Sequence, residues 1–334
     1  MAMTTILVHI HHPDFSLWSF PPELGARLRA RFAERGVRFR LAPQEVGFGE
    51  AIAQADALLG RGLDAETLAR ATRLRWVQLP TAGVMGALFP ELVESPVVLT
   101  NARGVHAVPM AEHLLGLMLA LVRKIHLARD HQRAARWGQE ALWGGDPPFD
   151  ELDGKTLGVV GLGAVGSALA VRAHALGMRV LAVRRRPAQP LPPGVAEARG
   201  EGDLPWLLER SDFVADCLPH TRRTRRLFSD AQFADMRPGA YFLNVGRGNT
   251  VDEAALVRAL ESGRLGGAGL DVTAEEPLPA GSPLYSLPQV LLTPHVSGTS
   301  RRFWERAGDL FAENIERFLD GRPLRNVVDK REGY

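Results

Sequence analysis

The sequence predicts an α/β protein made of two parallel-sheet units, and three observations lead to that fold class. Short apolar runs alternate with amphipathic segments along most of the chain, as in parallel sheets covered by helices. At 334 residues the chain is long for one core and matches about two domains of ~150 residues. Near its middle, a strand-like run leads into a glycine pattern that is typical of doubly wound sheets.

The first hundred residues form one alternating series, which starts with the strand-like run TTILVHI. The expected strands are 4–10, 37–41, 56–60, 75–79 and 96–100. The helices expected between them are 22–36, 48–55 and 65–72. This alternation places the strands in one parallel sheet.

A second series begins at KTLGVVG, and its sheet is expected to be parallel as well. The expected strands are 157–160, 179–183, 212–217, 240–245, 267–272 and 290–294. The expected helices are 164–176, 204–210, 252–263 and a final amphipathic helix at 299–319. The two units are joined by the segment that begins at Ala107 and again near residues 294–297.

One long helix is expected from Ala107 to about Arg136. Its residues 114–122 are apolar on every face, and such a helix in a globular protein is buried on all sides. We therefore expect it to contribute both to the core and to the contact with a partner subunit. An irregular arm follows that carries Trp137 and Trp143, for which two readings stay open, buried packing or contact with the active site of a neighbouring subunit.

Composition and charge disfavour several function classes. The sequence contains 40 basic and 38 acidic residues, and this balance of charge disfavours a nucleic-acid partner. The single cysteine, Cys217, leaves no internal disulfide and fits a reducing cytoplasm. No signal peptide is apparent, and the longest apolar run, 114–122, is too short for a membrane span of ~20 residues. We expect a cytoplasmic protein without a membrane or nucleic-acid partner.

The stretch GLGAVG is the clearest local motif of the chain. Gly161 permits a tight turn, Gly163 lets a pyrophosphate approach the backbone, and Gly166 lets helix and strand pack closely. Ala164 and Val165 open the following helix, whose unpaired N–H groups attract phosphates. Between a strand and a helix, the motif predicts a Rossmann-like dinucleotide site. The alternative is a glycine-rich turn that binds nothing.

Three arginines, Arg184, Arg185 and Arg186, close the strand expected at 179–183. In NAD-binding units an acid at this place holds the ribose hydroxyls, and an acid would repel the 2′-phosphate of NADP. Guanidinium groups bind that phosphate through paired N–H donors. The sequence therefore predicts that NADPH is preferred over NADH, and the alternative is a solvated arginine loop.

Three ionisable residues, Arg247, Glu276 and His295, each follow an apolar strand. Ligands of open α/β sheets bind beyond the carboxyl ends of the strands, so these residues form a candidate catalytic set. Reducing a ketone needs a hydride and a proton, and a histidine near neutrality can supply the proton. Glu276 would orient the ring, and Arg247 would polarise the carbonyl and hold a neighbouring carboxylate. Asp271 either accepts a hydrogen bond from the nicotinamide carboxamide or caps a buried turn; the sequence leaves both readings open.

Several stretches resemble the D-2-hydroxyacid dehydrogenase family, which includes glyoxylate/hydroxypyruvate reductases and phosphoglycerate dehydrogenases. The most specific are LPHTRRTRRLF, MRPGAYFLNVGRGNTVDEAAL, GAGLDVTAEEPLP and VLLTPHVSGTS. By this resemblance Arg247, Glu276 and His295 are the catalytic residues, and the protein is a homodimer formed around the long helix and arm. The implied domains are a discontinuous substrate domain at 1–101 and 297–334, and a dinucleotide-binding domain at 102–296.

The resemblance also implies two groups of binding residues. Substrate would be bound by the backbone N–H groups of a small loop and by two catalytic side chains: Ala82, Gly83, Val84, Arg247 and His295. Spacing alone also allows an ordinary glycine turn at that loop. Residues implied along the cofactor are Leu218, Pro219, Thr224, Val245, Asp271 and Gly298. Arg103 and His106 receive no role.

The expected activity is reduction of a small 2-keto acid, such as glyoxylate or hydroxypyruvate, to the D-2-hydroxy acid with NAD(P)H, NADPH being preferred. The alternative is a dinucleotide-sensing protein of the same fold, similar to a corepressor, without turnover. Formate oxidation is disfavoured because that branch carries glutamine in place of Glu276. No metal is expected, since His9, His11 and His12 lack the spacing of a metal site.

Overall fold

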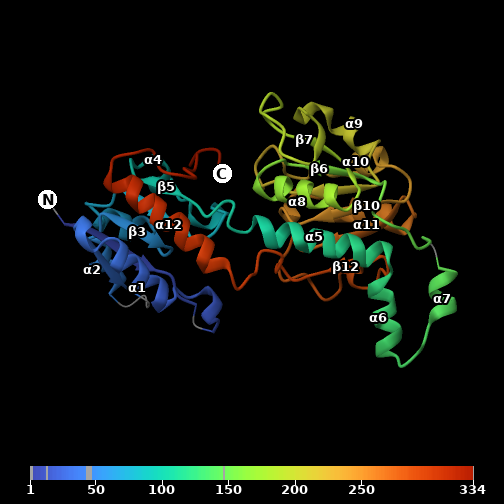
Figure 1. The fold of residues 1–334 in the computed structure, drawn as a ribbon, viewed down its shortest axis with the longest axis horizontal. Helices are drawn as coiled ribbons and strands as arrows, with labels where there is room; N and C mark the ends of the chain where they lie inside the picture. The colour runs from blue at the N-terminus through green and yellow to red at the C-terminus, as the bar shows by residue number, and fades with distance from the viewer. Residues whose placement is uncertain (1–2, 13, 43–46, 146, 334) are drawn as a thin grey trace. The chain divides into compact units, whose positions relative to one another are not determined.

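The protein is represented by a computed structural model that describes all residues except 1–2, 13, 43–46, 146 and 334 (Figure 1). The chain divides into two compact units. Unit 1 comprises Met1–His106 and Ser300–Tyr334, and unit 2 comprises Ala107–Thr299. Each unit is a parallel sheet with helices on its faces, and unit 1 is discontinuous in sequence, so the predicted fold class is confirmed.

The sheet of unit 1 has five strands in the order β2-β1-β3-β4-β5, and every neighbouring pair is parallel. The strands are β1 (Thr4–His9), β2 (Val37–Leu41), β3 (Ala57–Gly60), β4 (Trp76–Gln78) and β5 (Val98–Thr100). The helices are α1 (Pro22–Arg31), α2 (Phe48–Ile52), α3 (Ala65–Arg70), α4 (Pro90–Glu94) and α12 (Phe303–Leu319). Short 3₁₀ turns occupy Ser16–Trp18, Ala33–Arg35 and Met85–Ala87.

Both faces of this sheet are apolar, as expected when helices cover a parallel sheet on either side. Ile6 and Val8 of β1 belong to one cluster, which also contains buried residues of α1 and α12. Leu7 points to the other face and packs in a second cluster with residues of α2. The amphipathic helix predicted at the end of the chain is confirmed, because Phe303, Phe311 and other residues at helical spacing are buried on one side of α12.

The sheet of unit 2 has seven parallel strands in the order β12-β11-β10-β9-β6-β7-β8. The strands are β6 (Thr156–Val160), β7 (Arg179–Val183), β8 (Val195–Arg199), β9 (Phe213–Asp216), β10 (Ala240–Asn244), β11 (Leu265–Leu270) and β12 (Val290–Leu292). The helices are α5 (Ala107–Val122), α6 (Ile125–Arg133), α7 (Gln139–Trp143), α8 (Ala164–Ala175), α9 (Leu204–Leu208), α10 (Asp230–Asp235) and α11 (Glu253–Glu261). Short 3₁₀ turns lie at Glu201–Asp203, Gly248–Thr250 and Pro283–Tyr285.

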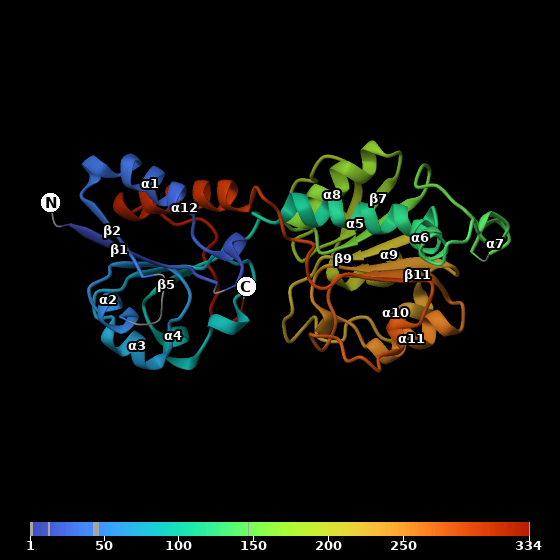
Figure 2. The same cartoon turned by 90° about the horizontal axis from the view of Figure 1, so that it is seen from below.

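Helices α5 and α8 cover one face of this sheet, and α9, α10 and α11 cover the other (Figure 2). The strand order reverses between β6 and β9, and a ligand crevice of a doubly wound sheet opens at the carboxyl ends of the strands on either side of such a reversal. The edge strand β8 was not predicted from the sequence. It carries the charged residues Glu197 and Arg199, which are typical of an exposed sheet edge. Arg199 Nε lies 2.7 Å from Glu197 Oε1.

The prediction of one long helix from Ala107 to about Arg136 is wrong, because the chain turns between α5 and α6. Lys124 adopts the left-handed conformation at this corner, with φ of 51°. Its ammonium group donates to the carbonyl oxygens of Leu142 at 2.9 Å and Gly145 at 2.7 Å. These bonds connect the corner to the arm that contains α7 (Figure 1). Among the described residues, no helix is both long enough and apolar enough to cross a membrane.

Candidate active site

The glycine turn between β6 and α8 has the local geometry that a dinucleotide requires. Gly161 has a φ of 98°, a value that residues with a Cβ seldom adopt. A Cβ on Gly166 would lie 2.5 Å from the carbonyl oxygen of Gly161, so the helix packs on the turn as closely as glycine allows. A Cβ on Gly163 would meet no atom within 4 Å. The backbone at Gly163 and Ala164 is therefore open, with the amino terminus of the 12-residue helix α8 beside it.

The structure brings Glu276 and His295 into direct contact. Both residues lie in loops that follow the carboxyl ends of neighbouring strands, β11 and β12. The Nδ1 atom of His295 is 2.7 Å from Oε2 of Glu276. The other oxygen of Glu276 accepts a hydrogen bond from the backbone N–H of Thr273 at 3.1 Å. The carboxylate thus holds one side of the imidazole, which leaves Nε2 as the ring atom that can exchange a proton with a ligand.

Asp271 fixes the loop that carries His295. Its carboxylate is buried and accepts from Thr293 Oγ1 at 2.6 Å and from the N–H groups of Val296 and Ser297, each at 2.9 Å. Its carbonyl oxygen accepts from the N–H of His295 at 2.9 Å. These bonds support the capping alternative for Asp271. They also hold His295 at φ of 53°, a left-handed conformation that is uncommon for a residue with a side chain.

Arg247 follows β10 and lies beside the same loops. Its guanidinium donates to the carbonyl oxygen of Gly246 at 2.7 Å. Partial burial lowers the pKa of Arg247 from its ordinary value, and the negative charge of Glu276 opposes that shift. A Cβ on Gly248 would lie 1.9 Å from the carbonyl carbon of Thr273, so only glycine permits this approach of the two loops. The three predicted catalytic residues therefore belong to adjacent loops at one edge of the unit 2 sheet.

Asp216, at the end of β9, is a residue whose importance sequence reasoning missed. Its side chain is fully buried, and burial raises its pKa to about 7, although hydrogen bonds from Thr250 and Leu218 oppose the shift. The hydroxyl of Thr250 lies 2.5 Å from Asp216 Oδ2 and 2.6 Å from the carbonyl oxygen of Arg247. One hydroxyl proton cannot serve both acceptors. Thr250 donates to Asp216 when that carboxylate is charged, and it donates to the carbonyl oxygen of Arg247 when Asp216 is protonated and donates to Thr250 instead.

We expect Asp216→Asn to remove a pH dependence of stability, because asparagine has the donor and acceptor of the protonated acid. Below pH 3.8 both folded and unfolded wild type hold this proton, and between pH 3.8 and about 7 only the folded state does. The stability contributed by the protonated carboxyl therefore falls as pH rises from 3.8 to about 7, and about 3 kcal/mol of this loss lies between pH 5 and pH 7. Urea unfolding at pH 5 and pH 8 measures this change.

In that experiment the stability of Asp216→Asn relative to wild type should increase from pH 5 to pH 8. The exposed residue Asp230, in a surface pair with Arg258, supplies the control variant Asp230→Asn, which makes the same chemical substitution at the protein surface. Parallel pH profiles for wild type and Asp216→Asn would contradict a protonated Asp216.

The arginines after β7 do not share one environment, and this corrects the expectation for Arg184. Its side chain is buried, and its guanidinium donates to the carbonyl oxygens of Pro187 at 3.0 Å and Pro190 at 3.2 Å, and also to that of Gln189. These bonds shape the loop and engage both terminal nitrogens of the guanidinium, while its buried Nε has no hydrogen-bond partner among the described residues. Arg185 and Arg186 are exposed.

The remaining residues that were expected along the cofactor lie at the carboxyl edge of the same sheet. Thr224 closes the loop after β9 by donating to the carbonyl oxygen of Pro219 at 2.7 Å. Leu218 is half-buried against the core, and Val245 is fully buried, with its N–H donating to the carbonyl oxygen of Asp216 at 3.3 Å. Gly298 follows the loop that Asp271 holds.

The loop after β4, in unit 1, presents unbonded amides. Asn101 Nδ2 donates to the carbonyl oxygen of Ala82 at 2.8 Å, and the hydroxyl of Thr81 donates to that of Gly83 at 2.9 Å. These bonds fix the carbonyl oxygens of the loop. The N–H groups of Ala82, Gly83 and Val84 donate to no acceptor in the part of the chain that the structure describes. A ligand carboxylate is an acceptor that suits such a loop.

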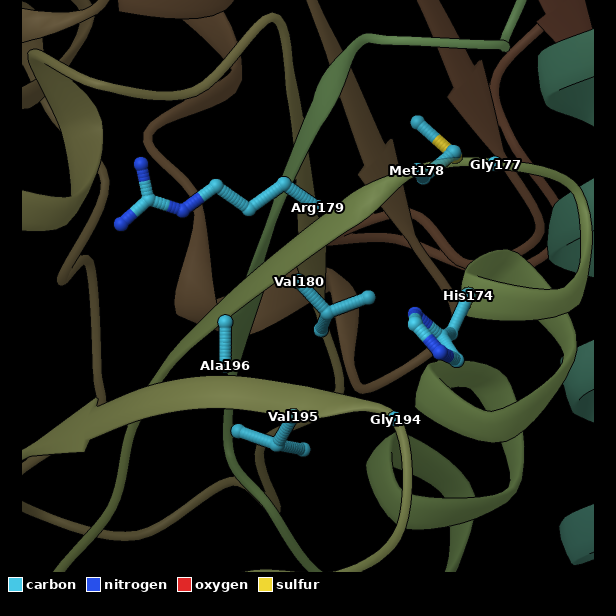
Figure 3. A pocket seen from close by; sticks show the side chains of 8 residues that line it. All are labelled: His174, Gly177, Met178, Arg179, Val180, Gly194, Val195 and Ala196. Carbon is cyan, nitrogen blue, oxygen red and sulfur yellow. The ribbon is translucent and has the colours of Figure 1, made fainter.

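A hollow of about 480 Å³ lies elsewhere in unit 2, at the amino-terminal ends of β7 and β8 (Figure 3). His174, Arg179, Gly194 and Ala196 are among its lining residues. It is remote from the site above, because parallel strands place their amino-terminal ends at the opposite edge of the sheet. Within the described ranges, no group of three or more His, Cys, Asp and Glu side chains is arranged to hold a metal ion.

Comparison with known proteins gives matches over both units. A family model for the "D-isomer specific 2-hydroxyacid dehydrogenase, NAD binding domain" matches residues 115–297. A glyoxylate/hydroxypyruvate reductase B of Klebsiella pneumoniae is 35% identical over 325 residues, which is 93% of this chain and 96% of that protein.

Two solved structures are similar over their whole length. A D-isomer specific 2-hydroxyacid dehydrogenase from Xanthobacter autotrophicus, solved with NADPH and MES, has a TM-score of 0.79 and 30% identity, covering 100% of both chains. An NADPH-dependent glyoxylate/hydroxypyruvate reductase from Sinorhizobium meliloti, solved with NADP and sulfate, has a TM-score of 0.78 and 27% identity. That match covers 99% of this chain and 100% of the other.

Proposed function

The chain belongs to the D-isomer-specific 2-hydroxyacid dehydrogenase family and is an NAD(P)-dependent oxidoreductase, and within this class we propose that it reduces a small 2-keto acid, such as glyoxylate or hydroxypyruvate, to the D-2-hydroxy acid. The observation that carries the proposal is the 2.7 Å contact between His295 and Glu276 at the carboxyl edge of a dinucleotide-type sheet. Unit 2 is the dinucleotide-binding domain and unit 1 the substrate domain in this proposal.

The residues of the glycine turn fit a nicotinamide dinucleotide, since the space over Gly163 is open and the amino terminus of α8 adjoins it. When bound, the dinucleotide supplies the hydride that the reduction requires. His295 supplies the proton to the carbonyl oxygen from Nε2, and Glu276 stabilises the charged imidazolium through Nδ1. In the direction of oxidation the same imidazole, unprotonated, accepts the hydroxyl proton.

Two positively polarised groups hold the substrate in this proposal. The guanidinium of Arg247 binds the 2-carboxylate and polarises the adjacent carbonyl oxygen. Within unit 1, the unbonded N–H groups of Ala82, Gly83 and Val84 form a candidate site for a substrate carboxylate. The proposed substrate therefore has a carboxylate next to the carbonyl that is reduced.

Consumption of NADPH and NADH, followed by absorbance with a panel of 2-keto acids, tests the proposed function. We expect turnover with glyoxylate and hydroxypyruvate. Absence of turnover with every 2-keto acid, combined with tight dinucleotide binding, would instead support a protein that senses the dinucleotide.

We propose that NADPH is preferred and that Arg185 and Arg186 bind its 2′-phosphate. Their exposure at the end of β7 and the presence of NADPH or NADP in the two similar structures support this assignment. The double variant Arg185→Gln/Arg186→Gln is expected to lower kcat/KM for NADPH about tenfold or more and to leave that for NADH within about twofold. Steady-state kinetics with both dinucleotides measure the ratio.

A matched control for this prediction is Arg29→Gln/Arg38→Gln, which removes two exposed charges from unit 1. This control variant should leave kcat/KM unchanged for both NADPH and NADH. A wild-type preference for NADH, or an equal loss for both dinucleotides in the variant, would contradict the assignment.

We also propose that the protein is a homodimer formed around α5, α6 and the arm. Large apolar side chains are exposed there, among them Ile125, Trp137 and Trp143. Their exposed fractions are 55, 87 and 65%, respectively. Apolar exposure of this kind is typical of an interface. A monomeric mass in sedimentation at micromolar concentration would contradict this proposal.

A further inference from the structure

The main chain of Arg247 is held by hydrogen bonds to its carbonyl oxygen. That oxygen accepts from the N–H of Thr250 at 3.1 Å and from Asn244 Nδ2 at 3.2 Å, and the hydroxyl of Thr250 lies 2.6 Å from it. Asn244 is buried at the end of β10 and also accepts from the N–H of Gly246 at 2.8 Å. These groups fix the backbone from which the guanidinium of Arg247 extends.

The Thr250 hydroxyl is shared between Arg247 and Asp216, because it also lies 2.5 Å from Asp216 Oδ2. Its single proton bonds to one acceptor at a time. Asp216 Oδ1 accepts from the N–H of Leu218 at 2.9 Å, so Oδ2 is the oxygen that holds the proton when Asp216 is neutral. A neutral Asp216 therefore donates to Thr250 and leaves the Thr250 proton for Arg247, whereas a charged Asp216 accepts that proton itself.

The surroundings of Asp216 favour its protonated form. Its side chain is fully buried, and the residues paired with it on β6 and β10 are the uncharged Val160 and Asn244. Partial burial and the negative charge of Asp216 raise the pKa of the adjacent Cys217 thiol, which is therefore neutral. Burial raises the pKa of Asp216 to about 7. The residue thus changes its charge near neutrality.

The other titratable groups around this pair bond elsewhere. The guanidinium of Arg247 donates to the preceding carbonyl oxygen at 2.7 Å. Asp252 and Glu253, at the amino terminus of α11, accept from backbone N–H groups at 3.3 and 2.5 Å. The charged or titratable side chains of the loop after β9 and of α10 and α11 include four that are half-buried or exposed: His220, Asp230, Asp235 and Arg258. Among the described residues, none of these groups forms an ion pair with Asp216.

We propose that Asp216 and Thr250 are positioning residues for Arg247, which holds the substrate carboxylate more tightly while Asp216 carries a proton. With that proton present, Thr250 donates to the carbonyl oxygen of Arg247 and completes the bonds that fix its main chain. Once the proton is lost, the Thr250 hydroxyl turns to the carboxylate, and Arg247 keeps one bond fewer. The proposal rests on the proposed function, in which Arg247 binds the 2-carboxylate.

The KM for a 2-keto acid at pH 6 and pH 8, with saturating dinucleotide, tests the assignment. The KM of wild type is expected to rise about three- to tenfold from pH 6 to pH 8, the usual effect of one hydrogen bond. Asp216→Asn, which has the donor of the protonated acid at every pH, should match wild type at pH 6 and have the lower KM at pH 8. Thr250→Val should have the higher KM at pH 6 and match wild type at pH 8.

Comparison with wild type at the same pH removes the titration of His295, which every variant shares. Thr250→Ser keeps the hydroxyl and should follow wild type at both pH values. The exposed residues Asp230 and Thr72 supply the matched controls Asp230→Asn and Thr72→Val, which should also follow wild type. A KM of Asp216→Asn equal to that of wild type at pH 8 would overturn the proposal. Equal increases in Thr250→Val and Thr250→Ser would also overturn it, because they would show that packing and not the hydroxyl is needed.

Binding of oxamate gives a readout without turnover, because oxamate has a carboxylate next to an amide carbonyl that is not reduced. Calorimetry with the dinucleotide bound is expected to show a dissociation constant that rises from pH 6 to pH 8 in wild type and stays constant in Asp216→Asn. Wild-type binding that is equal at the two pH values, or absent at both, would overturn the proposal. If wild type reduces no 2-keto acid, the proposed function fails, and oxamate binding still decides the role of Asp216.

Discussion

Replacing His295 with glutamine is expected to lower kcat by about 10²- to 10⁴-fold, the usual contribution of general acid–base catalysis. Glutamine has an amide near the position of the ring nitrogens but cannot release or accept a proton near neutrality. Because His295 Nδ1 is held by Glu276 at 2.7 Å, the ring has one free nitrogen, and its proton is the one that the substitution removes. The loss should therefore appear in kcat, with the dissociation constant of the dinucleotide unchanged.

Pre-steady-state and steady-state kinetics with a 2-keto acid measure the loss, and fluorescence titration measures dinucleotide binding. Glu275→Gln changes an exposed acid next to Glu276 and serves as the control. Full activity in His295→Gln would exclude His295 as the proton donor. A large increase in the dinucleotide dissociation constant would show instead that the substitution had disturbed the loops after β11 and β12.

The second large effect is expected at Arg247. Arg247→Met is expected to lower kcat/KM for the 2-keto acid by about 10²- to 10³-fold, the usual range for loss of a group that stabilises developing charge on oxygen. Methionine fills similar space without the charge, so the half-buried position stays packed. Unlike the loss at His295, this loss should include a higher KM, because the guanidinium also holds the 2-carboxylate in the ground state.

Arg247→Lys distinguishes charge from geometry. It keeps one positive charge but lacks the two-pronged donor, so we expect it to recover part of the loss. Arg258→Gln, which breaks a surface ion pair with Asp230, is the control for removal of an arginine from unit 2. A normal KM in Arg247→Met would contradict the proposed contact with the carboxylate.

The parts of the site that the sequence predicted are those fixed by local pattern. Gly161, Gly163 and Gly166 act through the backbone of six consecutive residues, so their spacing alone predicts the turn that the structure contains. Glu276 and His295 were expected to meet because each follows an apolar strand, and parallel strands end at one edge. The structure places their side chains in contact.

The parts that the sequence did not predict depend on partners far along the chain or in a loop without a regular pattern. The raised pKa of Asp216 comes from its burial in the folded unit, and its hydrogen-bond partner Thr250 is 34 residues away. The corner at Lys124 is stabilised by carbonyl oxygens 18 and 21 residues later, so helical periodicity alone continues past it. Arg184 looked equivalent to Arg185 and Arg186 because nothing in three consecutive arginines shows which one folds into the loop.

The four hydrogen bonds between Asp271 and the 293–297 loop bear on the entropy of catalysis. They hold the backbone of His295 in a conformation with φ of 53° before any ligand arrives. The backbone of His295 therefore reaches this conformation during folding. Little further conformational entropy of this loop is lost when the proton is transferred. The temperature dependence of turnover should accordingly reflect an enthalpic barrier, up to the temperature at which this loop itself melts.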